Sequence, residues 1–148
     1  MFFILLVIFI LWSEWKLKNY FEAVYDFKKQ KLIFKDTIRL RKYHNFGAFF
    51  NFMETRKKLL HAISIIFTLT IGLFFLITLC SKGNKMLKLG LSLLLGGAFS
   101  NTYDRLSREY VVDYFSFCSP WERLNRIVFN ISDFCIIIGT LITVLTSS

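Results

Sequence analysis

The stretch that decides the fold is "LGLSLLLGGAFS" (Leu89–Ser100), which runs directly into "NTYDRLSREYVVDYF" (Asn101–Phe115). The first part is an apolar segment without a charge, and the second part brings Asp104 and, nine residues later, Asp113. Ionisable side chains at the edge of a bilayer are costly, so they are kept where they have a function or a partner. We therefore expect these two carboxyl groups to have partners elsewhere in the chain.

The composition indicates a membrane protein with a single domain. Of the 148 residues, 55% are hydrophobic and 18% are aromatic, and the chain contains 18 Phe but only one Pro. A soluble domain of this size seldom carries so many apolar side chains, because most of its surface must be polar. The apolar residues also occur in blocks, which is typical of membrane-spanning helices.

Four of these blocks predict transmembrane helices. Residues 59–80 contain no Asp, Glu, Lys or Arg over 22 positions, which is long enough to cross a bilayer of about 30 Å. The N-terminal block lacks a basic start and a small-residue cleavage site, so an uncleaved span is favoured over a signal peptide. The expected fold class is an all-α membrane protein with four transmembrane helices, a small extramembrane β-sheet and an interfacial segment. The single domain covers residues 1–148, with spans at about 2–24, 59–80, 87–104 and 127–146 and extramembrane segments at 25–58 and 105–126.

The segments between the spans predict the sheet. Apolar and basic side chains alternate from residue 38 to residue 41, which indicates a short strand. Asn45 and Gly47 interrupt it, and the aromatic residues 48–53 are expected to rest on the membrane surface, with the small sheet against the bilayer. Residues 105–126 mix Trp and Phe with Arg, which fits either an interfacial segment or a solvated connector.

Polar residues near the end of the third span are candidates for function or for helix packing. Gly97, Asn101 and Asp104 are spaced i, i+4, i+7 and therefore share one helix face. A structural interpretation gives Asn101 a hydrogen bond across helices and pairs Asp104 with Arg105 at the interface. A second ridge of small residues suits close helix packing and consists of Ser92, Gly96 and Ser100.

The fourth span begins with "FNISD", in which Asn130 and Asp133 lie on one face. A carboxylate in an apolar helix is functional by default, and Asp113, flanked by apolar residues, is its natural partner. Two carboxyl groups within hydrogen-bond reach share a proton, so one can activate a water while the other polarises a carbonyl. Spacing alone does not show that the two meet. An ion pathway through Asp104 and Asp133 is a further possibility, but the second span offers no line of polar side chains for it.

Other site chemistries find little support. The three cysteines, Cys80, Cys118 and Cys135, do not form a disulfide framework. No CxxC, HExxH, GxSxG or glycine-rich phosphate loop is present, and His44 and His61 are far apart in the sequence. A metal site is therefore not expected.

The motifs resemble those of the lipoprotein signal peptidase (signal peptidase II) family. In that family the third span ends in GGxxGNxxDR, a GxVVDF stretch follows, and the fourth span begins with FNxAD. The corresponding stretches here are "GGAFSNTYDR", "EYVVDYF" and "FNISD", in the same order. Upstream, "HNFGAFF" is similar to the family's NxGAAF segment on the small sheet outside the membrane. The resemblance covers roughly residues 37–145 and includes the four-span layout.

The resemblance implies an intramembrane aspartic endopeptidase that removes the signal peptide from lipid-modified prolipoproteins, cutting before the diacylglyceryl cysteine. It implies that Asp113 and Asp133 are the catalytic dyad and that no cofactor or metal is used. The residues implied to bind the substrate or support the dyad are Asn45, Asn101, Asp104, Arg105 and Asn130. The expected location is the bacterial inner membrane, multi-pass, with the active site near the outer face. The expected partners are the prolipoprotein and membrane lipids, not nucleic acid, and a monomer is expected.

The chain departs from the family's pattern at several positions. Ser100 and Glu109 stand where the family has glycine, and Ser132 stands where it has alanine. In the first span the family's Asp, followed four residues later by Lys, is absent, and Glu14 with Lys18 is a poor substitute. The alternative function is therefore that of a catalytically degenerate paralogue, which binds lipidated peptides or anionic lipids without cleaving them.

The charge distribution opposes the family topology. Of the 19 Lys and Arg residues, 16 lie on the side opposite the termini, and the positive-inside rule places such segments in the cytoplasm. All ten acidic residues also lie on that side, so its net charge is about +6. A folded sheet that is translocated as a unit can override the rule, and we expect the family topology.

Overall fold

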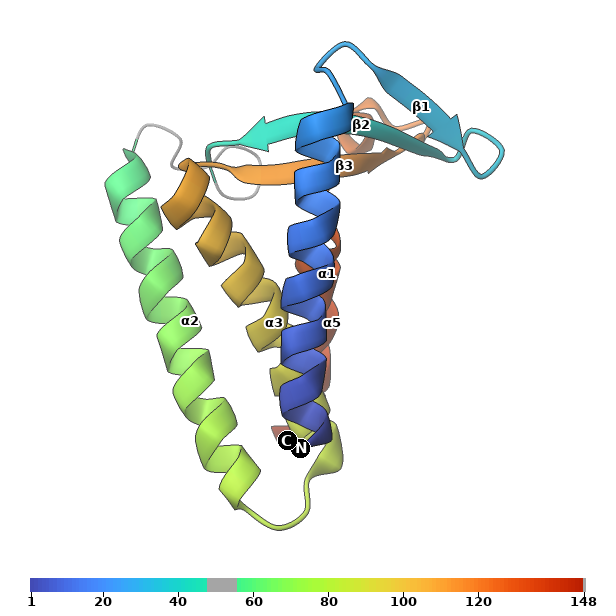
Figure 1. The fold of residues 1–148 in the computed structure, drawn as a ribbon. Coiled ribbons are helices and arrows are strands. Elements are labelled where there is room, and N and C mark those ends of the chain that lie inside the picture. Colours follow the sequence, from blue (N-terminus) through green and yellow to red (C-terminus); the bar gives the residue numbers. More distant parts are fainter. Residues whose placement is uncertain (48–55, 148) are drawn as a thin grey trace.

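Four long helices stand beneath a three-stranded sheet in the computed structural model, which describes residues 1–47 and 56–147 (Figure 1). The long helices are α1 (Phe2–Val24), α2 (Lys57–Cys80), α3 (Lys85–Arg108) and α5 (Ile131–Ser147). The strands are β1 (Gln30–Ile33), β2 (Ile38–Asn45) and β3 (Val111–Phe117), and the short helix α4 (Glu122–Arg126) follows β3. The start of α1 and the end of α5 lie at the end of the bundle away from the sheet (Figure 1). The expected combination of a helical bundle with a small sheet is confirmed.

One of the described helices, α2, is long and apolar enough to cross a membrane by length and composition. Residues Ile131–Thr146 form a shorter apolar helix. Helix α1 is continuous, but its apolar sequence contains charged residues, including Glu14 and Lys18, whose side chains are buried inside the bundle. The four expected spans therefore stay a prediction.

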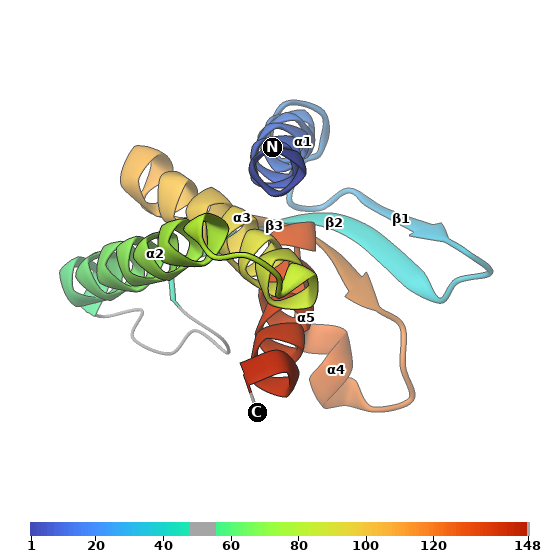
Figure 2. The same cartoon turned by 90° about the horizontal axis from the view of Figure 1, so that it is seen from below.

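Helix α3 is the central element, because it contacts each of the other three long helices (Figure 2). Its approach to α5 requires glycine. A Cβ atom on Gly97 would lie 2.5 Å from the carbonyl oxygen of Ser132, and one on Gly139 would lie 2.5 Å from the backbone nitrogen of Leu94. The predicted ridge of small residues faces α1, where a Cβ atom on Gly96 would meet Ile10 at 3.0 Å. The apolar core of the bundle consists of Val7, Ile71, Phe75, Leu91, Leu94, Leu95 and Ala98.

The sheet is antiparallel in the order β1-β2-β3. Its register pairs Asn45 with Val111 and Tyr43 with Asp113, after an irregularity between Leu40 and Tyr43. The end of α1 packs on the sheet through a cluster that consists of Phe21, Tyr25, Val112 and Tyr114. The pairing of β3 with β2 holds Asp113 at the sheet end of the helical bundle.

The structure extends and corrects the predicted boundaries. The strand expected at residues 38–41 is confirmed and continues to Asn45, whereas residues 111–117 form a strand that was not predicted. Helix α3 continues to Arg108, beyond the span limit expected near residue 104. Its C-cap residue is Glu109, whose φ of 68° is left-handed. The aromatic segment expected on the membrane surface, residues 48–53, lies outside the described residues.

Candidate active site

Asp113 lies in β3 with only 1% of its surface exposed. Asn45 lies two residues beyond the position in β2 that pairs with Asp113, so both side chains are on the same face of the sheet. The Nδ2 of Asn45 donates a hydrogen bond to Oδ2 of Asp113 at 3.0 Å. The Oδ1 of Asn45 accepts the backbone N–H of Gly47 at 3.1 Å, which fixes the orientation of the amide. One carboxyl oxygen of Asp113 is thus held from β2.

Asp133 lies in the first turn of α5. Its backbone N–H donates to Oδ1 of Asn130 at 3.0 Å, and its Oδ2 accepts the backbone N–H of Asn130 at 3.1 Å. This reciprocal pattern is that of a helix capping box. The other oxygen, Oδ1, accepts Nδ2 of Asn101 from α3 at 2.9 Å. The carboxyl group is therefore held both by its own helix terminus and by the neighbouring helix.

Asn130 joins the two aspartates. Its Nδ2 donates to Oδ1 of Asp113 at 2.6 Å, while its Oδ1 and its backbone N–H both bond to Asp133. Burial raises the pKa of Asp113 well above its ordinary value, the charge of Asp133 adds to the rise, and the bonds from Asn45 and Asn130 oppose it. Asn130 therefore links the two aspartates in one hydrogen-bond network, and that their carboxyl groups share a proton stays a prediction.

Arg105 lies beside this network rather than in open water. Its Nη2 donates to the carbonyl oxygen of Gly47 and its Nη1 donates to the carbonyl oxygen of Asn101, both at 3.3 Å. Its Nε is buried without a hydrogen-bond partner among the described residues. The guanidinium thus reaches the chain next to Asn45.

Asp104 braces the strand that carries Asp113. Its Oδ2 accepts the backbone N–H of Val112 at 3.2 Å and lies 2.9 Å from Nζ of Lys18. Its Oδ1 lies 3.4 Å from Nε of Arg108. The expected ion pair with Arg105 is wrong, because consecutive residues of a helix face different directions whereas residues four apart are neighbours.

Glu14 and Lys18 belong to the same network, although the family's motifs do not predict them as site residues. They are 0% and 1% exposed. Nζ of Lys18 donates to Oδ1 of Asn101 at 2.9 Å, and Glu14 accepts hydrogen bonds from Tyr114 and Ser132. The signal that could have found them is an acid and a base four residues apart inside an apolar helix, where unpaired charges are too costly to keep.

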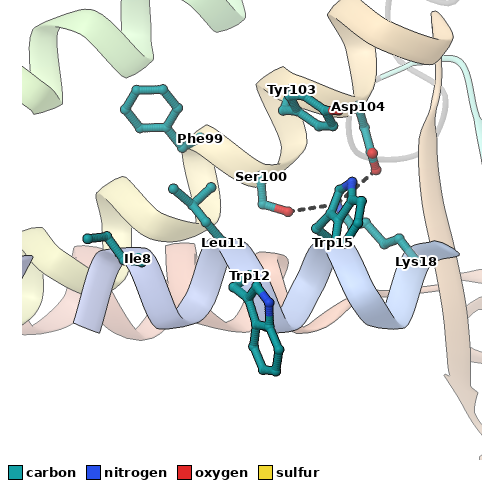
Figure 3. Close-up of a pocket in the computed structure, with 9 residues that line it drawn as sticks. All are labelled: Ile8, Leu11, Trp12, Trp15, Lys18, Phe99, Ser100, Tyr103 and Asp104. Carbon is teal, nitrogen blue, oxygen red and sulfur yellow. Dashed lines mark hydrogen bonds and ion pairs between the residues drawn. The ribbon is translucent and has the colours of Figure 1, made fainter. Parts of the chain in front are cut away.

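A cavity of about 440 Å³ lies between α1 and α3 (Figure 3). Neither Asp113 nor Asp133 lines it. Lys18 lies at one end, but its ammonium group already bonds to Asp104, Ser100 and Asn101, so the cavity presents chiefly apolar surface. The lining residues are Ile8, Leu11, Trp12, Trp15, Lys18, Phe99, Ser100, Tyr103 and Asp104.

Within residues 1–47 and 56–147, no three His, Cys, Asp or Glu side chains are grouped as a metal site requires. Cys80, Cys118 and Cys135 are free thiols.

Known proteins share this fold and these sequence features. The family model for signal peptidase (SPase) II matches residues 3–148. The lipoprotein signal peptidase of Shouchella clausii is 32% identical over 108 residues, which are 72% of this chain and 66% of the relative. That of Coxiella burnetii (strain Dugway 5J108-111) is 33% identical over 68% of this chain and 62% of the relative. The match therefore spans slightly less than two thirds of these relatives.

A solved structure of a bacterial membrane enzyme superposes with a TM-score of 0.84. The superposition covers 98% of this chain and 86% of the other, at 21% sequence identity, and it supports the fold of the bundle and sheet. The family model, which covers nearly the whole sequence, carries the assignment together with the relatives. The chain belongs to the signal peptidase II family.

Proposed function

We propose that this protein is an intramembrane aspartic endopeptidase that removes the signal peptide from lipid-modified prolipoproteins, cutting before the diacylglyceryl cysteine. The observation that carries the proposal is the single side chain of Asn130, which bonds to Asp113 and to Asp133 at once. Membership of the signal peptidase II family supports proteolysis and this class of substrate.

The two carboxyl groups have different environments, which suits them to different roles. Asp113 is almost fully buried and its pKa is raised, so we assign the shared proton to it. Asp133 is more exposed than Asp113 and lies in the first turn of α5, where the helix dipole favours a negative charge, so we assign the charged form to it. Asp113 is then the general acid and Asp133 the general base.

The reaction runs in two balanced steps. Asp133 takes a proton from a water molecule as the water oxygen attacks the scissile carbonyl carbon, and Asp113 gives its proton to the carbonyl oxygen. The tetrahedral diol then breaks the C–N bond. Asp133 gives its proton to the leaving nitrogen, and one hydroxyl of the diol returns a proton to Asp113 as the carboxylic acid forms. Both carboxyl groups end in their starting states.

Arg105 is suited to hold the substrate backbone. Its buried Nε has no partner among the described residues, and its other nitrogens are fixed by carbonyl oxygens at Gly47 and Asn101. A preorganised donor of this kind binds a peptide carbonyl with little loss of conformational entropy. Asn45 and Asp104 support the dyad from the sheet and from α3.

We also propose that α1, α2, α3 and α5 all cross the membrane as one domain covering residues 1–148. They contain 23, 24, 24 and 17 residues, or about 26–36 Å at 1.5 Å per residue, against a hydrocarbon core of about 30 Å. The large hydrophobic residues of α2 that are at least 60% exposed are Ile66, Leu69, Leu73, Phe74, Leu76 and Ile77. Lipid, rather than water, suits such side chains.

The sheet, whose strand β3 carries Asp113, lies at the end of the bundle away from the start of α1 (Figure 1). We propose that this end faces the outer side of the bacterial inner membrane, where a prolipoprotein held by its lipid anchor reaches the dyad. The anchor keeps the scissile bond at the depth of the site, so the enzyme, acting as a monomer, needs no cofactor to capture its substrate.

Cleavage of a purified, lipid-modified precursor tests the proposal. Asp113→Asn and Asp133→Asn should each lower the cleavage rate by at least about 10³-fold, since removing a member of a catalytic unit costs about this much. Asp26→Asn is the matched control, because Asp26 is an exposed carboxylate outside the site. Its rate should equal that of the parent.

Two outcomes would contradict the proposal. Either dyad variant cutting as fast as the parent would show that the carboxyl groups are not the catalysts. Binding of the precursor without cleavage by the parent over a long incubation would favour the alternative of a non-cleaving paralogue.

A further inference from the structure

Three positions at which the chain departs from the family's pattern lie together in the structure. Oγ of Ser132 donates to Oε2 of Glu14 at 2.7 Å, and Nζ of Lys18 donates to Oγ of Ser100 at 3.0 Å. All four residues are at most 5% exposed. The hydroxyls of Ser132 and Ser100 thus each give a buried charged group of α1 a hydrogen bond that glycine or alanine could not supply.

The carboxylate of Glu14 is shared between the sheet and α5. Its Oε1 accepts the hydroxyl of Tyr114 at 2.5 Å, and its Oε2 accepts both the backbone N–H of Ser132 at 3.1 Å and the Ser132 hydroxyl. The Tyr114 hydroxyl also accepts the backbone N–H of Ile131 at 3.1 Å. Burial and the charge of Glu14 both raise the pKa of Tyr114, which keeps its hydroxyl protonated as a donor.

These contacts cap the start of α5. The first N–H groups of a helix have no partner within the helix and need one from elsewhere. Here the N–H of Ile131 bonds to Tyr114, that of Ser132 to Glu14 and that of Asp133 to Asn130. A carboxylate at this end is also favoured by the helix dipole. Glu14 therefore fixes the helical turn from which the Asp133 side chain projects.

We propose that Glu14 is a positioning residue for Asp133. We also propose that the Ser132 hydroxyl is placed to bond a glutamate at position 14 and not the shorter aspartate. The inference rests on the proposed function, in which Asp133 is the general base. An aspartate at position 14 would withdraw the carboxylate by about 1.5 Å, one C–C bond, and would leave the hydroxyl of Ser132 without its acceptor. Glu14 and Ser132 thus replace the family's Asp and Ala as a pair, and the first helix keeps its role in the site.

Amide hydrogen exchange tests the positioning without requiring cleavage. In Glu14→Gln, residues 131–133 should lose protection by roughly tenfold to 100-fold, the value of a hydrogen bond to a charged group. Residues 66–77 of α2 serve as the internal reference and should not change. Glu122→Gln is the matched control variant, since the Glu122 side chain is 87% exposed and lies 3.7 Å from Arg126. Unchanged protection at 131–133 in Glu14→Gln would overturn the proposal, whether or not the parent cleaves.

Kinetics then test the consequence for catalysis. Glu14→Gln should lower kcat by about 10–100-fold per folded enzyme with KM within about twofold, since a displaced base impairs the chemical step and not binding. Ser132→Ala should lower kcat in the parent and raise it in Glu14→Asp, because only the shorter acid leaves the hydroxyl unpaired. A kcat that stays at the parent value, or a Ser132→Ala effect of the same sign in both backgrounds, would contradict the pairing. Failure of the proposed function itself would show differently, as a parent that does not cleave.

Discussion

The side-chain amide of Asn130 positions both aspartates of the site. Its Nδ2 donates to Asp113, and its Oδ1 accepts the backbone N–H of Asp133. Asn130→Ala removes both bonds from a residue that is 0% exposed. We expect a loss of about 1–3 kcal/mol in the free energy of unfolding and a fall of about 100-fold in kcat. Thermal unfolding and cleavage kinetics on the same preparation measure the two effects. Full activity in Asn130→Ala would show that the bridge does not position the acids.

Asp113 should also shape the pH dependence of stability. Its pKa is raised above the ordinary 3.8 in the folded protein, mainly by burial, so the folded state holds the proton more tightly than the unfolded chain. The resulting stability is fully present below about pH 4 and is lost as pH rises through the folded pKa. Asp113→Asn should therefore show a smaller decline of melting temperature between pH 4 and pH 8 than the parent. An equal decline in the two proteins would contradict this account.

Among single residues, the sequence predicted several of the polar side chains around Asp113 and Asp133, but not Glu14. Asn45, Asn101 and Asn130 were expected at the site through the family's motifs, and the hydrogen bonds place them there. Glu14 was left out because its partner Ser132 lies 118 residues away. A contact at that separation leaves no periodic signal in a single sequence. The pointers to Glu14 were the cost of burying a charge and its place, with Lys18, where the family has an Asp followed by a Lys.

The contact between α3 and α5 places Asn101 against Asp133, and its closeness depends on Gly97. A Cβ atom there would lie 2.5 Å from the carbonyl oxygen of Ser132, so Gly97→Ala must push the helices apart. We expect a loss of about 1–3 kcal/mol in stability and at least about tenfold in kcat. Gly72→Ala in α2 is the matched control, because its Cβ would meet only Leu95 at an ordinary 3.8 Å. The prediction is wrong if the two variants behave alike.

The end of α3 is strained where the chain carries Glu109 in a left-handed conformation with a φ of 68°. A non-glycine residue pays about 1 kcal/mol there, and glycine does not. Glu109→Gly should stabilise the protein by about 0.5–1 kcal/mol, or about 1–4 °C in melting temperature. The lost ion pair with Lys57, at 3.9 Å between exposed side chains, should not offset this gain. A lower melting temperature would show that the position does not need glycine.

The elements themselves were predictable to different degrees. The helices follow from long apolar blocks, whereas β3 was missed because Val111, Val112, Asp113 and Tyr114 are all buried. A strand buried on both faces lacks the alternation by which a half-exposed strand is recognised. The length of α3 was underestimated because its polar end resembles a connector, although Arg105 and Arg108 continue the helix.

On the scale of the whole molecule, the charge at the sheet end is less positive than the count of basic residues suggests. Lys18 is buried against Asp104, Arg108 also pairs with Asp104, and Lys42 lies 3.7 Å from Glu22. At the opposite end, Lys82, Lys85 and Lys88 lie in or beside the short turn between α2 and α3. Both sheet-end segments are also short enough to count in the positive-inside rule, so their 16 basic residues still oppose a cytoplasmic location for the turn, and the proposed orientation rests on the family topology.

This orientation predicts which engineered cysteines a membrane-impermeant maleimide can reach. Lys28 and Lys82 are exposed positions at the two ends, and each is changed to cysteine in a chain whose three native cysteines are serine. Lys28→Cys should be labelled in intact spheroplasts, whereas Lys82→Cys should be labelled only after the membrane is opened, because the bundle separates them by the thickness of the bilayer. Retained cleavage by both variants is the control for correct folding. The reverse pattern would put the dyad on the cytoplasmic face, where a lipid-anchored precursor awaiting cleavage outside the membrane would not reach it.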